Sequence, residues 1–187
     1  MDFGRTKVLI VFYLTQSGEL TVVIYAAMKY FQPVNPGYLK QLETAKSRKK
    51  ENKKFLDRLK HLKPADLDIT TNQLHDQAFE HIDCLQCANC CRTTGPLLLG
   101  KDIDRLAKHF HLRPSEFTEQ YLRIDEDRDY VFKKMPCPFL ASDNYCSVYE
   151  NRPVACRDYP HTQQRKIIQK LAITYHNSMI CPAVAEV

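Results

Sequence analysis

The sequence has few of the features that mark nucleotide-binding or hydrolytic enzymes. Its 187 residues include no tryptophan and only five glycines, which leaves little room for a nucleotide-binding glycine fingerprint. It contains no phosphate-cradling glycine loop, no nucleophile elbow and no H-E-x-x-H zinc helix. These absences exclude the commonest catalytic motifs, so no catalytic residue is assigned and the question of enzymatic activity stays open. An Asn-x-Ser/Thr glycosylation acceptor is also missing.

Cysteine, in contrast, is abundant and clustered. The first four cysteines follow a C-x2-C-x2-C-C spacing within eight residues. A gap of two residues lets neighbouring thiolates turn onto one ion or cluster, because the chain folds back over that distance. The spacing therefore predicts metal binding. The eight candidate ligands are Cys84, Cys87, Cys90, Cys91, Cys137, Cys146, Cys156 and Cys181.

Disulfide bonds are the main alternative use of so many cysteines. The adjacent Cys90 and Cys91 cannot bridge each other without straining the peptide between them, and Cys84 and Cys87 are too close for a comfortable disulfide loop. We therefore expect metal ligation in a reducing compartment, and a cytoplasmic location, because exposed thiolates would be oxidised outside the cytosol. A secreted binding protein stapled by disulfides is kept as an alternative.

Residues 1–37 form an apolar extension that ends in a linker. Residues 8–14 are wholly apolar and residues 20–28 nearly so, while the linker at 32–37 carries two prolines and a glycine. A β-hairpin turning at residues 16–19, or an artefactual extension, explains the pattern most simply. A signal peptide or membrane span is the other interpretation, although Glu19 would cost about 3 kcal/mol at the centre of a span. Membrane contact is expected, if at all, only through residues 8–28.

Residues 38–83 predict a long basic helix followed by a helical lead-in to the cysteines. Between residues 40 and 63, ten Lys or Arg stand against three acidic residues, a net charge of +7, while the whole chain carries only +5. Phe55, Leu56, Leu59 and Leu62 follow helical spacing, so we expect this edge to pack on the body with the lysines in water. Without aromatic interleaving, nucleic acid is not an expected partner; no protein partner is predicted.

Residues 84–187 are expected to form the cysteine domain on a helical scaffold. Asp102 is suited to be the N-cap of a helix whose apolar residues recur at i, i+3, i+4 and i+7 from Ile103. Pro114 is suited to open a second helix. Residues 130–133 alternate like a short strand. These elements are interpreted as the support of the metal site.

Cys156 is expected in the first turn of a short helix that begins at Pro153. The helix N-terminus, Arg152 and Arg157 should lower the pKa of the thiol there and make it a ready ligand. His161 and His176 lie near cysteines in the sequence and are candidates to complete a site. The other histidines are expected to be surface or packing residues; these are His61, His75, His81, His109 and His111.

A longer pattern combines these motifs. It consists of Cys84-x2-Cys87-x2-Cys90-Cys91, Pro136-Cys137-Pro138, Cys146-x2-Tyr149-x2-Arg152-Pro153-x2-Cys156-Arg157-x-Tyr159-Pro160 and Cys181-Pro182. The combination resembles the YkgJ-type cysteine-cluster family, the CxxCxxCC domain described as zinc- or iron-chelating. The resemblance implies a small, mostly helical, intracellular metal-binding domain of undefined biochemical role. A flagellin lysine methylase group has a related cluster, so an iron–sulfur-dependent redox or methyl-transfer enzyme is an alternative.

The cofactor is expected to be zinc or iron. Eight thiolates could hold two zinc ions, one four-cysteine iron–sulfur cluster with four spare thiols, or one zinc ion. A C-x2-C-x2-C triplet with distant Cys-Pro pairs resembles ferredoxin-type ligation and favours a 4Fe-4S cluster. We expect Cys156 to close the site of Cys84, Cys87 and Cys90, with the remaining cysteines nearby. The predicted fold is mainly α, a small α+β domain of helices and a short hairpin around a cysteine metal site.

Overall fold

The computed structural model describes residues 9–14, 20–25 and 32–187. Strands β1 (Leu9–Leu14) and β2 (Leu20–Tyr25) pair antiparallel, with Leu14 opposite Leu20. This pairing is the one expected of a hairpin, and its predicted turn at residues 16–19 lies outside the described residues. Among the described helices, none is both long and apolar enough to cross a membrane.

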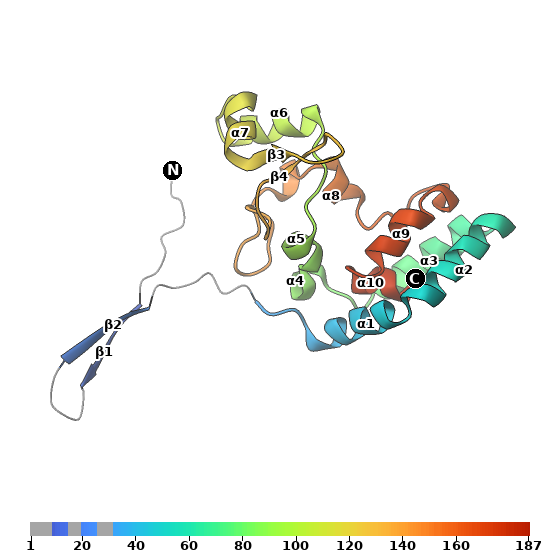
Figure 1. Ribbon diagram of the computed structural model, residues 1–187, viewed down its shortest axis with the longest axis horizontal. Helices are drawn as coiled ribbons and strands as arrows, with labels where there is room; N and C mark the ends of the chain where they lie inside the picture. Colours follow the sequence, from blue (N-terminus) through green and yellow to red (C-terminus); the bar gives the residue numbers. More distant parts are fainter. Residues whose placement is uncertain (1–8, 15–19, 26–31) are drawn as a thin grey trace.

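The rest of the described chain is mostly helical, which confirms the predicted fold class (Figure 1). The longer helices are α1 (Pro36–Ser47), α2 (Lys49–Leu62), α3 (Leu67–Phe79), α6 (Gly100–His109), α7 (Pro114–Tyr121) and α9 (Leu171–Asn177). The shorter ones are α4 (Cys84–Cys87), α5 (Asn89–Thr93), η1 (Tyr149–Asn151), α8 (Val154–Asp158), η2 (Ile167–Gln169) and α10 (Pro182–Glu186). Strands β3 (Leu122–Ile124) and β4 (Tyr130–Phe132) form a second antiparallel pair.

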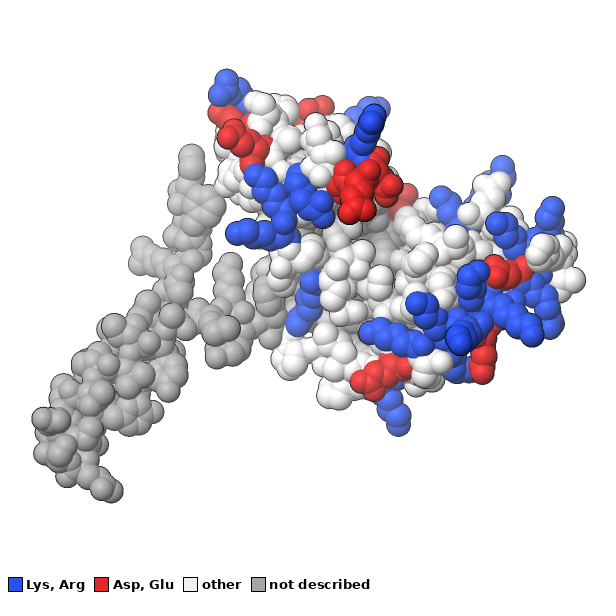
Figure 2. Space-filling model, in the orientation of Figure 1, with Lys and Arg blue, Asp and Glu red and all other residues white. Residues whose placement is uncertain are grey.

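The basic segment forms two helices where one was expected. Arg48, between α1 and α2, has φ −90° and ψ 14°, values in the bridge region outside the α-helical basin, so the helix axis is interrupted there. The side chains of α2 all stay at least partly exposed, and Figure 2 shows Lys and Arg gathered over this end of the molecule.

The apolar stripe of α2 packs less closely than the sequence predicted. Phe55 and Leu62 are 55% and 64% exposed. Phe55, Leu56 and Leu59 line a pocket of about 480 Å³ together with residues of α3, η2, α9 and α10. The stripe therefore faces the body of the protein across a pocket and is not buried in a close contact.

The first hydrophobic core lies between α6, α7 and the β3–β4 pair (Figure 1). Leu106 and Phe117 are both 0% exposed, and each such burial stabilises the fold by about 2–3 kcal/mol. The rings of Phe110 and Phe139 stack with centroids 5.1 Å apart. Pro114 opens α7 as predicted. We call this cluster the aromatic core.

The start of α6 differs from the prediction by three residues. The helix begins at Gly100 and its N-cap is Leu99, while Asp102 occupies the third helical position. The Asp102 carboxylate accepts a hydrogen bond from the Leu99 N–H at 3.0 Å. Asp102 thus still caps the helix end, but it does so from inside the first turn.

A second hydrophobic core lies where α10 packs against α1 and α3. We call it the terminal core; its buried members are Tyr38, Ala78, Ile82, Cys87, Cys181, Ala183 and Val184. The Tyr38 hydroxyl donates to the His81 carbonyl and accepts from the Asp83 N–H. This side chain therefore fixes the end of the helical lead-in just before the first cysteine.

Candidate metal centre

The C-x2-C-x2-C-C segment folds into two short helical turns, α4 and α5, between the two cores (Figure 1). The Asp83 carboxylate accepts from the Leu85 N–H at 2.8 Å and so starts α4. Ala88, at φ 47°, is in the left-handed conformation that ends α4 and lets α5 begin in a new direction. Of the first four cysteines, Cys84 and Cys87 thus lie on α4, and Cys90 and Cys91 lie on α5.

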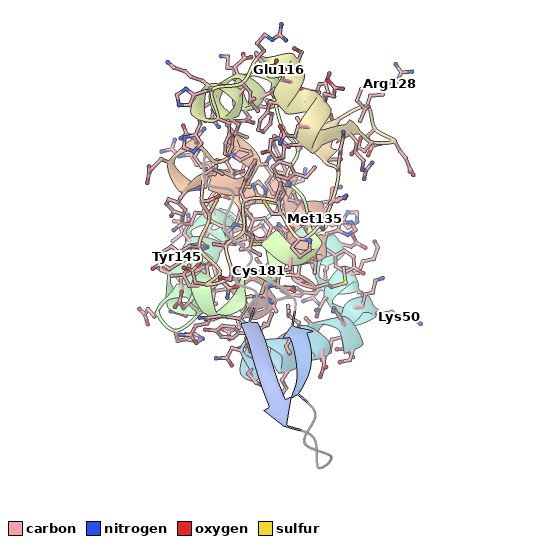
Figure 3. The ribbon with its side chains drawn as sticks, turned by 90° about the vertical axis from the view of Figure 1, so that its left-hand side faces the viewer. Lys50, Glu116, Arg128, Met135, Tyr145 and Cys181 are labelled. Atoms are coloured by element: carbon pink, nitrogen blue, oxygen red, sulfur yellow. The ribbon has the colours of Figure 1, made fainter. Side chains whose placement is uncertain are left out.

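The first group of thiols, the Cys181 group, borders the terminal core. It contains Cys84, Cys87, Cys90 and Cys181. Cys87 and Cys181 are both buried in that core, and the Asn89 side-chain amide donates to the Ile180 carbonyl at 2.7 Å. In Figure 3, Cys181 lies near the middle of the molecule, between the helices of the two cores.

Burial and mutual repulsion raise the pKa values of these thiols. The Cys84 side chain reaches the surface, yet the protein around its sulfur, then the thiols of Cys181 and Cys87, raise its pKa to about 11. The pKa of Cys181 is also raised by burial, while the N–H groups of Val184 and Ala183 oppose the rise. At neutral pH these metal-free thiols are protonated.

The second group of thiols, the Cys156 group, borders the aromatic core. It contains Cys91, Cys137, Cys146 and Cys156. Cys137 and Cys146 pack against that core, and the Cys137 N–H donates to the Cys91 carbonyl at 2.8 Å. A β-bridge between Leu140 and Cys146 closes the loop that leads to Cys146, and the Leu140 N–H donates to the Cys137 carbonyl at 3.0 Å.

The pKa of Cys156 moves in the opposite direction from the one predicted. Burial, and after it the thiols of Cys91, Cys137 and Cys146, together raise it to about 12. Arg152 lowers it only slightly, and Arg157 is exposed. The five-residue helix α8 has too small a dipole to outweigh the loss of hydration. The prediction of an activated thiolate at this position was wrong.

Cys91 is the point of contact between the two groups. Its sulfur lies 3.9 Å from that of Cys90. This contact lowers the pKa of Cys91 to about 7, and Arg92 contributes in the same direction. The pKa of Cys90 is raised by the same contact and by burial. Within this pair, Cys91 is therefore the thiol that ionises first.

No closed site tests the expectation that Cys156 joins Cys84, Cys87 and Cys90. Cys181, rather than Cys156, is among the thiols that raise the pKa values of Cys84 and Cys90, and it shares a hydrophobic core with Cys87. As the described side chains stand, no group of three or more His, Cys, Asp or Glu is arranged to hold a metal ion. The structure thus shows two neighbourhoods of thiols and not a closed coordination shell.

Histidine contributes little to either group. The buried Nδ1 of His161 makes no hydrogen bond to any described residue, and its ring lies 6.3 Å from that of Tyr159. His176 packs on Tyr175. Neither imidazole is among the groups that shift a thiol pKa. As expected for packing or surface residues, His75 contacts Thr162 at 2.6 Å, and the remaining histidines, His61, His81, His109 and His111, are exposed.

Two further residues shape the site. The buried Tyr159 hydroxyl makes no hydrogen bond to a nitrogen or oxygen of the described residues, and it lowers the pKa of the neighbouring Cys181 thiol. Burial raises the pKa of Tyr159, and all four thiols of the Cys181 group add to the rise. Asn144, 5% exposed, accepts from Arg92 and donates to the Leu85 carbonyl, both at 2.5 Å. It ties the loop before Cys146 to α4 and α5.

Sequence reasoning did not assign roles to these two residues. Tyr159 stands in the longer motif without an assigned function. Asn144 has a positive φ of 68°, typical of a turn, but its long-range hydrogen bonds have no local signal in the sequence.

Comparison with known proteins identifies the family of the chain. A family model described as "CxxCxxCC: Putative zinc- or iron-chelating domain" matches residues 83–181, just over half of the chain and all eight cysteines. No curated protein and no solved structure matches the chain. On the strength of this match, the chain belongs to the CxxCxxCC family of zinc- or iron-chelating domains.

Proposed function

We propose that this protein binds zinc or iron through the thiolates of its eight cysteines. One observation carries the proposal: the segments of Cys137 and Cys181 are hydrogen-bonded to α5, and all eight cysteines are free thiols, without a disulfide among the described residues. Soft thiolate ligands select zinc and iron–sulfur clusters over hard cations such as magnesium. The proposed ligands are Cys84, Cys87, Cys90, Cys91, Cys137, Cys146, Cys156 and Cys181.

The residues present fit such a cofactor in number and chemistry. Structural zinc sites and iron–sulfur clusters each use up to four thiolates, and each thiol group holds four cysteines. When bound, zinc would cross-link the segments, and an iron–sulfur cluster would in addition exchange electrons. The protein's own contribution is positional: Asn144 and the Cys137 N–H hold the loops together, and the two cores exclude water from one side of the thiols.

For the Cys181 group, we propose more specifically that the bound cofactor contains iron. Three of its ligands come from one loop, and the fourth, Cys181, is followed by Pro182 and arrives from a distant segment. Bacterial ferredoxins use the same combination of a C-x2-C-x2-C loop and a remote Cys-Pro. The position of Cys181 beside Cys84, Cys87 and Cys90 supports a 4Fe-4S cluster there.

A reducing compartment follows from the same chemistry. Free thiols at this density persist where glutathione and thioredoxin keep cysteine reduced. A cytoplasmic location therefore belongs to the proposal.

Anaerobic purification with elemental analysis and a visible spectrum tests the function. We expect bound zinc or iron, and for iron a broad band at about 400 nm from sulfur-to-iron charge transfer. A colourless protein with zinc alone would exclude the iron–sulfur form. Protein that is free of metal under these conditions, with all thiols reduced, contradicts the proposed function itself.

A further inference from the structure

We propose that the eight cysteines form two separate metal centres, one in the Cys181 group and one in the Cys156 group. This inference rests on the proposed function and deepens it, because it assigns each ligand to a centre. A single centre with spare thiols is the competing arrangement.

Two cysteines of each group are tied to a different hydrophobic core. Cys87 and Cys181 are members of the terminal core, together with residues of α1, α3 and α10. Cys137 and Cys146 pack against the aromatic core of α6, α7, β3 and β4. Because a protein interior is close-packed, thiols held in separate cores cannot all move to one ion without breaking one of the cores.

Separate anchors hold the segments of each group. Asn89, on α5, bonds the Ile180 carbonyl and so holds the residue before Cys181. The Cys137 N–H donates to the Cys91 carbonyl and so holds the second group to the middle of α5. The α5 turn is thus the shared support, with one remote segment bonded near its start and another near its middle.

The adjacent pair on α5 divides between the groups. Consecutive residues on a helix do not face each other, so Cys90 and Cys91 leave the backbone in different directions. The Cys91 thiol raises the pKa values of thiols in both groups, so its place is decided by the backbone, where its carbonyl accepts from the Cys137 N–H at 2.8 Å. Among the remote thiols, Cys181 is the one that raises the pKa of Cys90. The sulfurs of Cys90 and Cys91 remain 3.9 Å apart, so the two centres would be immediate neighbours.

The arrangement can be tested by comparing two double variants of the full chain, each lacking two cysteines. Cys84→Ser/Cys87→Ser removes two thiols from one group, and Cys87→Ser/Cys146→Ser removes one from each. The reduced proteins are titrated anaerobically with Co²⁺, whose thiolate charge-transfer band reports the ligands of each bound ion.

We expect the unsubstituted chain to bind two Co²⁺ ions. The within-group variant, Cys84→Ser/Cys87→Ser, should keep one Co²⁺ ion with the original affinity and band intensity. The across-group variant, Cys87→Ser/Cys146→Ser, damages both centres and should keep no ion with the original affinity and band intensity. The mirror pair Cys137→Ser/Cys146→Ser should match the within-group variant and replaces it if that chain does not fold. One Co²⁺ per unsubstituted chain, or identical behaviour of within-group and across-group variants, overturns the two-centre assignment. Binding of no Co²⁺ by the unsubstituted chain overturns the proposed function as well.

Discussion

Asp102 and Arg105, one turn apart on α6, form an ion pair that anchors the segment leading to Cys156. The Asp102 carboxylate is 0% exposed and accepts from the Arg105 guanidinium at 2.6 Å and from the Val154 N–H at 3.2 Å. Arg105 also donates to the carbonyls of Asn151 and Arg152. The pair therefore connects the aromatic core to the start of α8.

Removing the charge of Asp102 should destabilise the protein. Asp102→Asn leaves the partly buried Arg105 without its counter-ion, so we expect the free energy of unfolding to fall by about 3 kcal/mol. Asp104→Asn, an exposed change on the same helix, should alter it by less than about 0.5 kcal/mol. Urea denaturation measures both values. Equal stability of the two variants would show that the pair does not anchor α8.

Metal binding should strengthen steeply as pH rises. Seven of the eight thiols have raised pKa values, chiefly through burial for six of them and through the contact with Cys91 for Cys90. These thiols carry protons at neutral pH, and ligation must displace the protons. Zinc affinity measured by competition with a chelator between pH 6 and 8 should therefore increase, with protons released into the buffer. An affinity that does not change over this range would mean that thiols are not the ligands.

Acid should destabilise the metal-free fold through His75. Burial lowers the pKa of His75 below its ordinary value of 6.5, so folding favours the neutral ring. The contribution of the neutral His75 ring to the free energy of unfolding is complete above pH 6.5. It is lost as pH falls through the lowered pKa of the folded state.

The effect of His75 can be separated from general acid unfolding by substitution. We expect the melting temperature to drop between pH 7 and pH 5, and His75→Gln should make this drop smaller. His61→Gln, at an exposed position, should leave it unchanged. If His75→Gln and the unsubstituted protein lose the same number of degrees, His75 does not carry the acid sensitivity.

Tyr159→Phe should not weaken the metal-free protein. The hydroxyl is buried and makes no hydrogen bond to a nitrogen or oxygen of the described residues. Its polar neighbour is the Cys181 thiol, a weak hydrogen-bonding group, so the loss of hydration is poorly compensated. Its removal should raise the free energy of unfolding of chelator-treated protein by about 1 kcal/mol. The exposed Tyr145→Phe is the matched control. A loss of stability specific to Tyr159→Phe would show that the hydroxyl is paired in solution.

The sequence predicted the elements that depend on local patterns. The 3.6-residue spacing from Ile103 and the proline at position 114 located α6 and α7, since both signals act within one or two turns. The short strand β3 was missed, because its three residues are defined only by pairing with β4. The break at Arg48 was also missed, since no proline or glycine marks it.

In the candidate site too, the features set by local sequence patterns were predicted and those set by tertiary packing were not. The cysteine spacing correctly indicated which residues to examine, and the family match supports a zinc- or iron-chelating domain. Which remote cysteine joins Cys84 could not be predicted, because it depends on how α10 packs. The raised pKa of Cys156 was missed for a related reason: burial is a property of the folded chain, while the neighbouring arginines are visible in the sequence.

The mass of the intact, anaerobically purified chain, compared under native and denaturing conditions, tests the central claim most directly. Thiolate binding of metal predicts a native mass above the denatured mass by the weight of zinc or of iron and sulfide, and a denatured mass equal to that of the fully reduced sequence. Equal masses under both conditions, with the two hydrogens missing for each disulfide, would contradict the account.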